Sequence, residues 1–211
     1  MNLIIFGAST TWGAWDLKGG WVQRLRTSLD SKHLKSSSSD LYFVYNLGIS
    51  GDTTEDIIKR FDFELVQRNK ETNKNIIILA IGTTDSVWDN NLNRLKTPRE
   101  KFKSNISKLI NKAKKYSDKV IFIGSTPVNE TKVNPIPWDK NYSLLNKHIK
   151  KSKETIKKLC EGNNVYFVDL YNRFIREDYK KLLEDGIHPN SEGHKKIFEI
   201  VKTFLIQNKY I

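Results

Sequence analysis

Short, almost uninterrupted apolar runs alternate with longer stretches of mixed character along this 211-residue chain. The apolar runs predict strands at 3–6, 41–46, 75–81, 119–123 and 165–169. The mixed stretches predict helices near 20–30, 53–69, 97–116, 141–160 and 191–208. Three of the predicted strands carry almost no polar residue, which is typical of a parallel sheet buried on both faces. The repeated strand-then-helix order implies right-handed crossovers, so we expect an α/β fold with three layers, α/β/α.

The chain shows no internal repeat and no interdomain linker, and we expect residues 1–211 to form one domain. Its low-complexity stretch, KSSSSD at 35–40, predicts a flexible loop. The segment 124–140 is long for a connection in an α/β fold and follows the fourth predicted strand. Since ligands of open α/β sheets bind beyond the carboxyl ends of the strands, 124–140 is a candidate wall of a pocket.

Small and polar residues gather just after four of the predicted strands. The clusters are GAST at 7–10, NLGISGDTT at 46–54, GTTDS at 82–86 and GSTP at 124–127. The carboxyl ends of parallel strands meet at one edge of a sheet, so these clusters are expected to lie together. The sequence therefore predicts a functional site at that edge.

A further polar motif, DGIHPNSEGH, occupies 185–194. Asp185 and His188 stand three residues apart in a turn, ahead of a helix that Ser191 is placed to cap. A carboxylate beside a histidine can accept a hydrogen bond from Nδ1, which leaves Nε2 as a base. If His188 reaches Ser9 in the first cluster, the three residues form a Ser–His–Asp arrangement.

These residues also have a purely structural interpretation. Ser9 can cap a helix, and Asp185 and His188 can serve only in a turn. Among the histidines, only His188 combines a carboxylate at a useful spacing with a place near the C-terminal helix, which can return it to the sheet edge. His33 lies in a charged surface stretch, His148 lies among lysines on a helix expected to be exposed, and His194 has no evident partner.

Composition and charge narrow the classes of function. Lysine and arginine (36) exceed aspartate and glutamate (24), a net charge of +12 that can attract nucleic acid or other anions. The lysines are spread along helical stretches, so a solvated surface is favoured and nucleic-acid binding is the weaker alternative. Cys160 is the one cysteine, and we expect no disulfide, no metal and no cofactor. Without a signal-peptide pattern or a membrane-length apolar run, we expect a cytoplasmic protein.

Together the motifs resemble those of the SGNH hydrolases, also called the GDSL esterase/lipase family. The matches are Gly7-Ala8-Ser9 to the family's Gly-Asp-Ser block, NLGISGDTT to its glycine block, GTTD to its Gly-x-Asn-Asp block and DGIHP to its Asp-x-x-His-Pro block. The resemblance covers residue 4 to about residue 195. It implies a flavodoxin-like parallel sheet of five strands between helices.

The resemblance also implies a role for each matched residue. Ser9 would be the nucleophile, His188 the general base and Asp185 the acid that orients it. The backbone N–H groups of Ser9 and Gly51 would donate to the oxyanion, and Thr84 stands where the family has a further oxyanion donor.

The chain departs from the family pattern at two positions. Ala8 replaces an aspartate outside the triad, and Thr84 replaces the oxyanion-hole asparagine. Loss of one such donor typically costs about 10²–10³ in kcat, unless Thr83 or a backbone amide replaces it. These departures motivate an alternative, a binding or regulatory protein on the same scaffold with weak or no hydrolysis.

The expected function is hydrolysis of a small-molecule carboxylic ester, of the small acyl or acetyl ester, thioester or lysolipid class, through an acyl-enzyme on Ser9. Four tryptophans fall in or beside the loops at the strand ends: Trp12, Trp15, Trp88 and Trp138. They can line an acyl or sugar pocket, or they can pack on the core. The oligomeric state does not follow from the sequence.

Overall fold

The protein, described by a computed structural model over residues 1–35, 41–69 and 74–211, is built on a parallel sheet of five strands. The strands are β1 (Asn2–Gly7), β2 (Phe43–Gly48), β3 (Asn75–Ala80), β6 (Val120–Ile123) and β8 (Tyr166–Val168). Their order across the sheet is β2-β1-β3-β6-β8. Counted within this sheet alone, that is the flavodoxin-like order 2-1-3-4-5. The predicted strands and the predicted fold class are confirmed.

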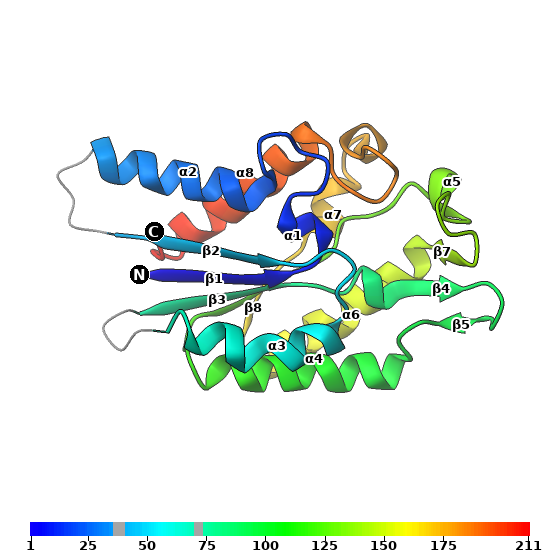
Figure 1. The fold of residues 1–211 in the computed structure, drawn as a ribbon, viewed down its shortest axis with the longest axis horizontal. Coiled ribbons are helices and arrows are strands. Elements are labelled where there is room, and N and C mark those ends of the chain that lie inside the picture. The colour runs from blue at the N-terminus through cyan, green and yellow to red at the C-terminus, as the bar shows by residue number, and fades with distance from the viewer. Residues whose placement is uncertain (36–40, 70–73) are drawn as a thin grey trace.

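Helices cover both faces of the sheet (Figure 1). One face carries α2 (Gly20–Lys35) and α8 (Ser191–Gln207). The other carries α3 (Thr54–Val66), α4 (Arg99–Lys114) and α6 (Asn146–Gly162). All five predicted helices are present, although α6 begins later than expected because residues 142–144 form a strand.

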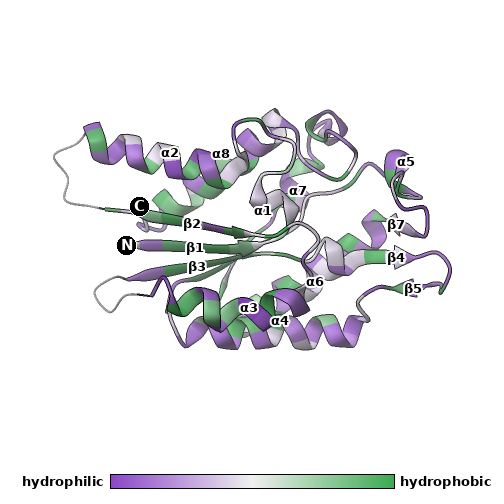
Figure 2. Cartoon of the chain, viewed as in Figure 1, coloured by the Kyte–Doolittle hydropathy of each residue, from purple (hydrophilic) through white to green (hydrophobic). Residues whose placement is uncertain are grey.

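The central strands divide their apolar side chains between two cores. In β1, Leu3 and Ile5 pack with α2 and α8, whereas Ile4 and Phe6 pack with α3 and α4. All four side chains are fully buried, and burying each contributes roughly 1.5–3 kcal/mol. Burial on both faces explains why these strands are uninterrupted apolar runs, green in Figure 2, while the outer helix faces are purple.

Several short elements lie outside the predicted pattern. A small antiparallel sheet, in the order β5-β4-β7, is formed by β4 (Val87–Asp89), β5 (Arg94–Leu95) and β7 (Tyr142–Leu144). The short helices are α1 (Ser9–Trp12), α5 (Glu130–Val133) and α7 (Leu170–Phe174), with 3₁₀ turns η1 (Thr84–Ser86) and η2 (Tyr179–Leu182). The small sheet lies beyond the carboxyl ends of the main strands (Figure 1). Strands of two or three residues are too short to show a period-2 pattern.

Two further expectations concern loops and membranes. The serine-rich loop predicted at 35–40 lies, apart from Lys35 at the end of α2, outside the described residues. None of the helices in the described ranges combines the length and apolar character that crossing a bilayer requires.

Candidate active site

The polar clusters that follow the strands meet at one edge of the main sheet, as predicted. A cavity of about 220 Å³ opens there between three of these clusters and the turn before α8. Its polar lining includes Ser9, Gly51, Thr84 and His188. The fourth cluster, 124–127, borders a neighbouring cavity of about 40 Å³. The site is therefore assembled from segments far apart in the sequence.

Ser9 begins α1, immediately beyond the end of β1. It does not act as a helix cap: the N-cap position is Ala8, and no side chain caps this helix. Two glycines let α1 approach the strands so closely. A Cβ at Gly7 would lie 2.0 Å from Thr11 Oγ1, and one at Gly48 would lie 2.3 Å from the backbone nitrogen of Trp12. The small residues at the ends of β1 and β2 thus hold Ser9 against the sheet edge.

Ser9, His188 and Asp185 form a continuous chain of hydrogen bonds. His188 Nε2 lies 2.8 Å from Ser9 Oγ, and His188 Nδ1 lies 2.6 Å from Asp185 Oδ2. A proton on Nδ1 that donates to the carboxylate leaves Nε2 free to accept the Ser9 proton. The three residues that the sequence singled out are therefore brought together in the order needed to activate a hydroxyl.

Asp185 is held by the backbone of its own turn. Its Oδ1 accepts hydrogen bonds from the N–H groups of Ile187 (2.9 Å) and His188 (2.8 Å). Gly186, between Asp185 and Ile187, has φ 97°, a left-handed conformation that favours glycine. Burial raises the pKa of Asp185, but the hydrogen bonds from the His188 side chain and from these two N–H groups outweigh it, so the pKa lies well below its usual value. The carboxylate therefore stays ionised at neutral pH.

A contact that the sequence did not predict completes this group. Trp15 Nε1 lies 2.8 Å from Asp185 Oδ2 and 3.2 Å from His188 Nδ1. The indole and imidazole rings meet edge to face, with centroids 5.7 Å apart. No spacing in the sequence signals this contact, because 170 residues separate Trp15 from Asp185.

The opposite side of the cavity comes from the loops after β2 and β3. Gly51 has φ 86°, so the glycine is required by its backbone conformation, and a Cβ there would meet nothing within 4 Å. Thr84 opens η1, next to the buried Asp85. Asp85 accepts hydrogen bonds from the Thr54 hydroxyl (2.7 Å) and the Thr54 N–H (3.0 Å), which fasten η1 to the start of α3. Burial raises the pKa of Asp85 despite these bonds.

The apolar wall of the cavity includes residues of the unpredicted small sheet and of segment 124–140. Val87, Leu144, Ile136 and Trp138 contribute side chains to it, which confirms 124–140 as a pocket wall. The other predicted tryptophans lie elsewhere. Trp88 stacks on the His148 ring, at 5.0 Å between centroids, and the half-exposed Trp12 is not among the residues that line the cavity.

Three expectations for neighbouring residues are wrong. His148 is buried rather than exposed, because Trp88 on the unpredicted β4 covers it. His194 does have partners: Nδ1 accepts from the Trp21 N–H (3.3 Å), and Nε2 lies 3.1 Å from the Ala14 carbonyl oxygen. Asn190, not Ser191, caps α8, and its side chain accepts from the Gly193 N–H at 3.0 Å.

Other parts of the described chain bring together fewer side chains suited to catalysis or metal binding. A larger hollow of about 450 Å³ lies between α2 and α8, but the described residues that line it are lysines, serines and aliphatic residues, without a histidine or a carboxylate. Within residues 1–35, 41–69 and 74–211, no group of three or more His, Cys, Asp or Glu side chains is gathered as metal ligands would be.

Comparison with protein families gives one match that spans most of the chain. The model of the family described as "GDSL-like Lipase/Acylhydrolase" matches residues 3–201. No curated protein sequence matches the chain significantly.

Solved structures with the same fold include several hydrolases. A lipase/acylhydrolase from Enterococcus faecalis is 19% identical, with a TM-score of 0.76 over 97% of this chain and 94% of that one. The acetyl xylan esterase AlAXEase is 21% identical, with a TM-score of 0.76 over 97% and 100% of the two chains. An acetyl xylan esterase from Geobacillus stearothermophilus is 20% identical, with a TM-score of 0.70 over 97% and 92%. At these identities the likeness establishes a shared fold and no more.

Proposed function

Because this chain belongs to the GDSL-like lipase/acylhydrolase family and is thus an ester-cleaving hydrolase, we propose that it cleaves short acyl esters through an acyl-enzyme on Ser9. The observation that carries the proposal is the hydrogen-bonded chain from Ser9 Oγ through His188 to Asp185, at 2.8 Å and 2.6 Å. The same three residues match the family's nucleophile and Asp-x-x-His blocks.

The reaction proceeds in two halves. His188 Nε2 takes the Ser9 proton as Oγ attacks the ester carbonyl carbon, and the resulting tetrahedral oxyanion collapses with loss of the alcohol, which receives the proton from His188. Water then loses a proton to His188 and attacks the acyl-enzyme, and a second collapse releases the carboxylic acid and returns the proton to Ser9. Asp185 remains ionised and stabilises the imidazolium in both halves.

Three groups on the cavity wall are assigned to the oxyanion. They are the backbone N–H groups of Ser9 and Gly51 and the hydroxyl of Thr84. The position of Thr84 is supported by the bonds between Asp85 and Thr54, which hold η1 at the sheet edge. A hydroxyl donates once and reaches less far than an asparagine amide, so this oxyanion site is weaker than that of the family pattern.

The size of the cavity favours a short acyl group. Its volume of about 220 Å³ lies below the roughly 300–1,000 Å³ of sites that take drug-sized ligands. The apolar residues Val87, Ile136 and Leu144 face this space, which suits an acetyl or other small acyl group rather than a charged one.

A fluorophosphonate that reacts with activated serines tests the proposal. We expect the native protein to be labelled, with the adduct located on Ser9 by mass spectrometry of the digested protein. A probe with a short alkyl group is expected to label faster than one with a long chain, because the cavity is small. Absence of labelling, or an adduct on another serine, would contradict the nucleophile assignment, and faster labelling by the long-chain probe would contradict the short acyl group.

Weak oxyanion stabilisation leads to a second expected result. Thr84→Asn should raise kcat about tenfold to 10²-fold for a short ester, with a small change in KM, because an amide reaches the charge that develops in the transition state. Thr83→Asn brings the same amide to the neighbouring position and should give no gain. An unchanged kcat in Thr84→Asn would mean that another donor already fills this place.

The binding-protein alternative rests on the same two departures, Ala8 and Thr84. It predicts no labelling of Ser9 and no gain from Thr84→Asn. The intact chain of hydrogen bonds from Ser9 to Asp185 favours the hydrolase, since a binding protein has no need of an aligned base and carboxylate.

A further inference from the structure

The carboxylate of Asp185 receives four hydrogen-bond donors, one of which comes from outside the motif. Oδ1 accepts from the N–H groups of Ile187 and His188, and Oδ2 accepts from His188 Nδ1. The fourth donor is the indole N–H of Trp15, at 2.8 Å from Oδ2. Its distance of 3.2 Å to His188 Nδ1 is a secondary contact, because that nitrogen carries the proton that is donated to Asp185.

We propose that Trp15 is a positioning residue of this site, whose indole N–H shares Asp185 Oδ2 with His188 and so limits how strongly the carboxylate holds the imidazolium. The inference rests on the proposed function, because it assigns Trp15 a place in the same reaction. An oxygen that accepts from two donors offers less negative charge to each of them. The indole also fixes the direction of the carboxylate that orients His188.

The backbone of Trp15 indicates that its position is imposed by its surroundings. Its φ is 65°, a left-handed conformation that a bulky residue adopts only when neighbouring contacts require it. Trp15 is 58% exposed as a residue, so burial of its ring does not account for the conformation. The contacts that hold it must come from the residues on either side.

Both neighbours of Trp15 are anchored in the protein. On one side, the Ala14 N–H donates to the Ser9 carbonyl oxygen (3.0 Å), and the Ala14 carbonyl oxygen accepts from His194 Nε2 (3.1 Å). On the other side, the buried carboxylate of Asp16 accepts from Arg24 at 2.9 Å and from the Gly20 N–H at 3.2 Å.

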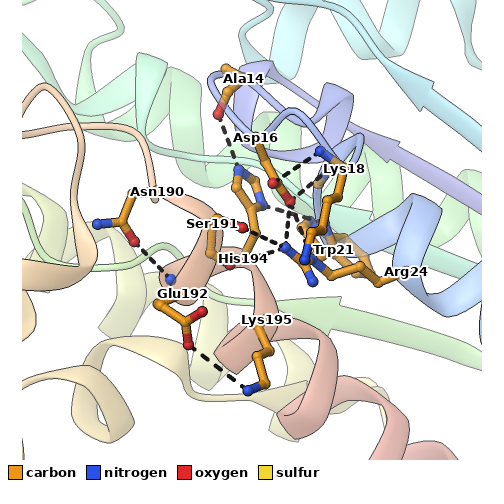
Figure 3. Close-up of polar contacts among 12 residues, drawn as sticks. Ala14, Asp16, Lys18, Trp21, Arg24, Asn190, Ser191, Glu192, His194 and Lys195 are labelled. Atoms are coloured by element: carbon orange, nitrogen blue, oxygen red, sulfur yellow. Dashed lines mark hydrogen bonds and ion pairs between the residues drawn. The ribbon is translucent and has the colours of Figure 1, made fainter.

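Arg24 and His194 connect this loop to α8. Figure 3 shows them converging on the loop between Ala14 and Lys18 from α2 and α8. Arg24 also donates to Ser191 Oγ (2.8 Å), and His194 is completely buried. Since α8 directly follows the turn that carries Asp185 and His188, one buried cluster fixes both the indole and the residues that it contacts.

The indole contact acts on His188 separately from the charged groups around it. Asp185 is the ionised partner on its own turn, and His194 on α8 is held neutral because burial lowers its pKa. Asp16 and Arg24 on the neighbouring segments form an ion pair with each other. Lys132 on α5 donates to the Glu184 carbonyl oxygen. The Trp15 N–H bonds directly to the carboxylate that partners His188.

The test compares Trp15→Phe, which keeps an aromatic ring and removes the N–H, with the native protein. Without the indole donor, Asp185 holds the imidazolium more strongly, so His188 loses its proton at higher pH. We expect the acid limb of kcat/KM to move upward by about 0.3 to 1 pH unit, and kcat at neutral pH to fall about threefold to tenfold. Titration of the His188 ring by NMR should move in the same direction, and this measurement needs no turnover.

Two further variants distinguish the effect of the Trp15 N–H group from the effects of its ring and of its backbone conformation. Trp15→Gly relieves the left-handed backbone and should move the limb in the same direction as Trp15→Phe. Trp12→Phe removes another exposed indole from the same segment without touching Asp185, and should leave the limb in place whether or not KM changes.

The outcomes distinguish this inference from the proposed function. An unmoved limb and an unmoved NMR titration in Trp15→Phe, in a protein that is active and labelled at Ser9, overturn the role of Trp15 and leave the hydrolase intact. A shift in Trp15→Gly alone also overturns it, since the ring would then be responsible. If the native protein is not labelled at Ser9, the proposed function fails, while the NMR titration still decides whether the indole tunes His188.

Discussion

Ser9→Ala is expected to lower kcat for p-nitrophenyl acetate by about 10⁶-fold, since removal of the serine from such a triad has an effect of that order. A methyl group cannot attack the carbonyl, so no acyl-enzyme forms. The fold should be unaffected, because Ser9 supplies its carbonyl oxygen to the N–H groups of Gly13 and Ala14, and the substitution leaves these bonds in place. Steady-state kinetics together with thermal unfolding separate loss of the nucleophile from loss of structure.

The matched control for this substitution is Ser107→Ala. Ser107 is half-buried on α4, and among the described residues its hydroxyl donates to the Lys103 carbonyl oxygen of its own helix, at 3.2 Å. It should retain native turnover. If Ser9→Ala hydrolysed the ester as fast as Ser107→Ala does, the catalytic nucleophile would have to lie elsewhere.

The parts of the fold that could be predicted are those in which one physical signal dominates. β1 and β3 are apolar on both faces because each face packs against a helix layer. Each strand therefore appears in the sequence as an uninterrupted run of apolar residues. The long helices follow from apolar residues at helical spacing. The meeting of Ser9 and His188 follows from topology, since both flank the carboxyl edge of the sheet.

The unpredicted parts depend on contacts between segments that carry no periodic signal. β4 and β7 pair through three residues each. They supply side chains to the cavity wall, and Trp88 on β4 covers His148. The contact of Trp15 with Asp185 depends on a left-handed backbone and on a buried cluster from α2 and α8. Neither can be derived from local sequence, because each needs the tertiary structure to be in place first.

Asp185→Asn is expected to lower kcat by about 10⁴-fold while leaving the turn intact. The asparagine oxygen can still accept from the N–H groups of Ile187 and His188, which hold the turn. Its amide, however, replaces Oδ2, which His188 Nδ1 approaches to 2.6 Å. Facing a donor, His188 must leave Nδ1 unprotonated and carry its proton on Nε2, toward Ser9. A histidine in that tautomer cannot accept the serine proton.

The size of this effect also tests whether Asp185 works as a charged group. Hydrogen bonds from His188 and Ile187 outweigh the effect of burial and hold the pKa of Asp185 below its usual value, so the native carboxylate is ionised throughout the neutral range. Because the charge is present in the native protein at both pH 6 and pH 8, kcat/KM of Asp185→Asn should be lowered at both. Asp178→Asn, at an exposed carboxylate paired only with Lys181 on the described surface, is the control and should keep native kinetics. If Asp185→Asn kept an activity within tenfold of native, His188 would have to take its orientation from another group. The role of Asp185 would then be structural, to hold the turn by accepting from its two N–H groups.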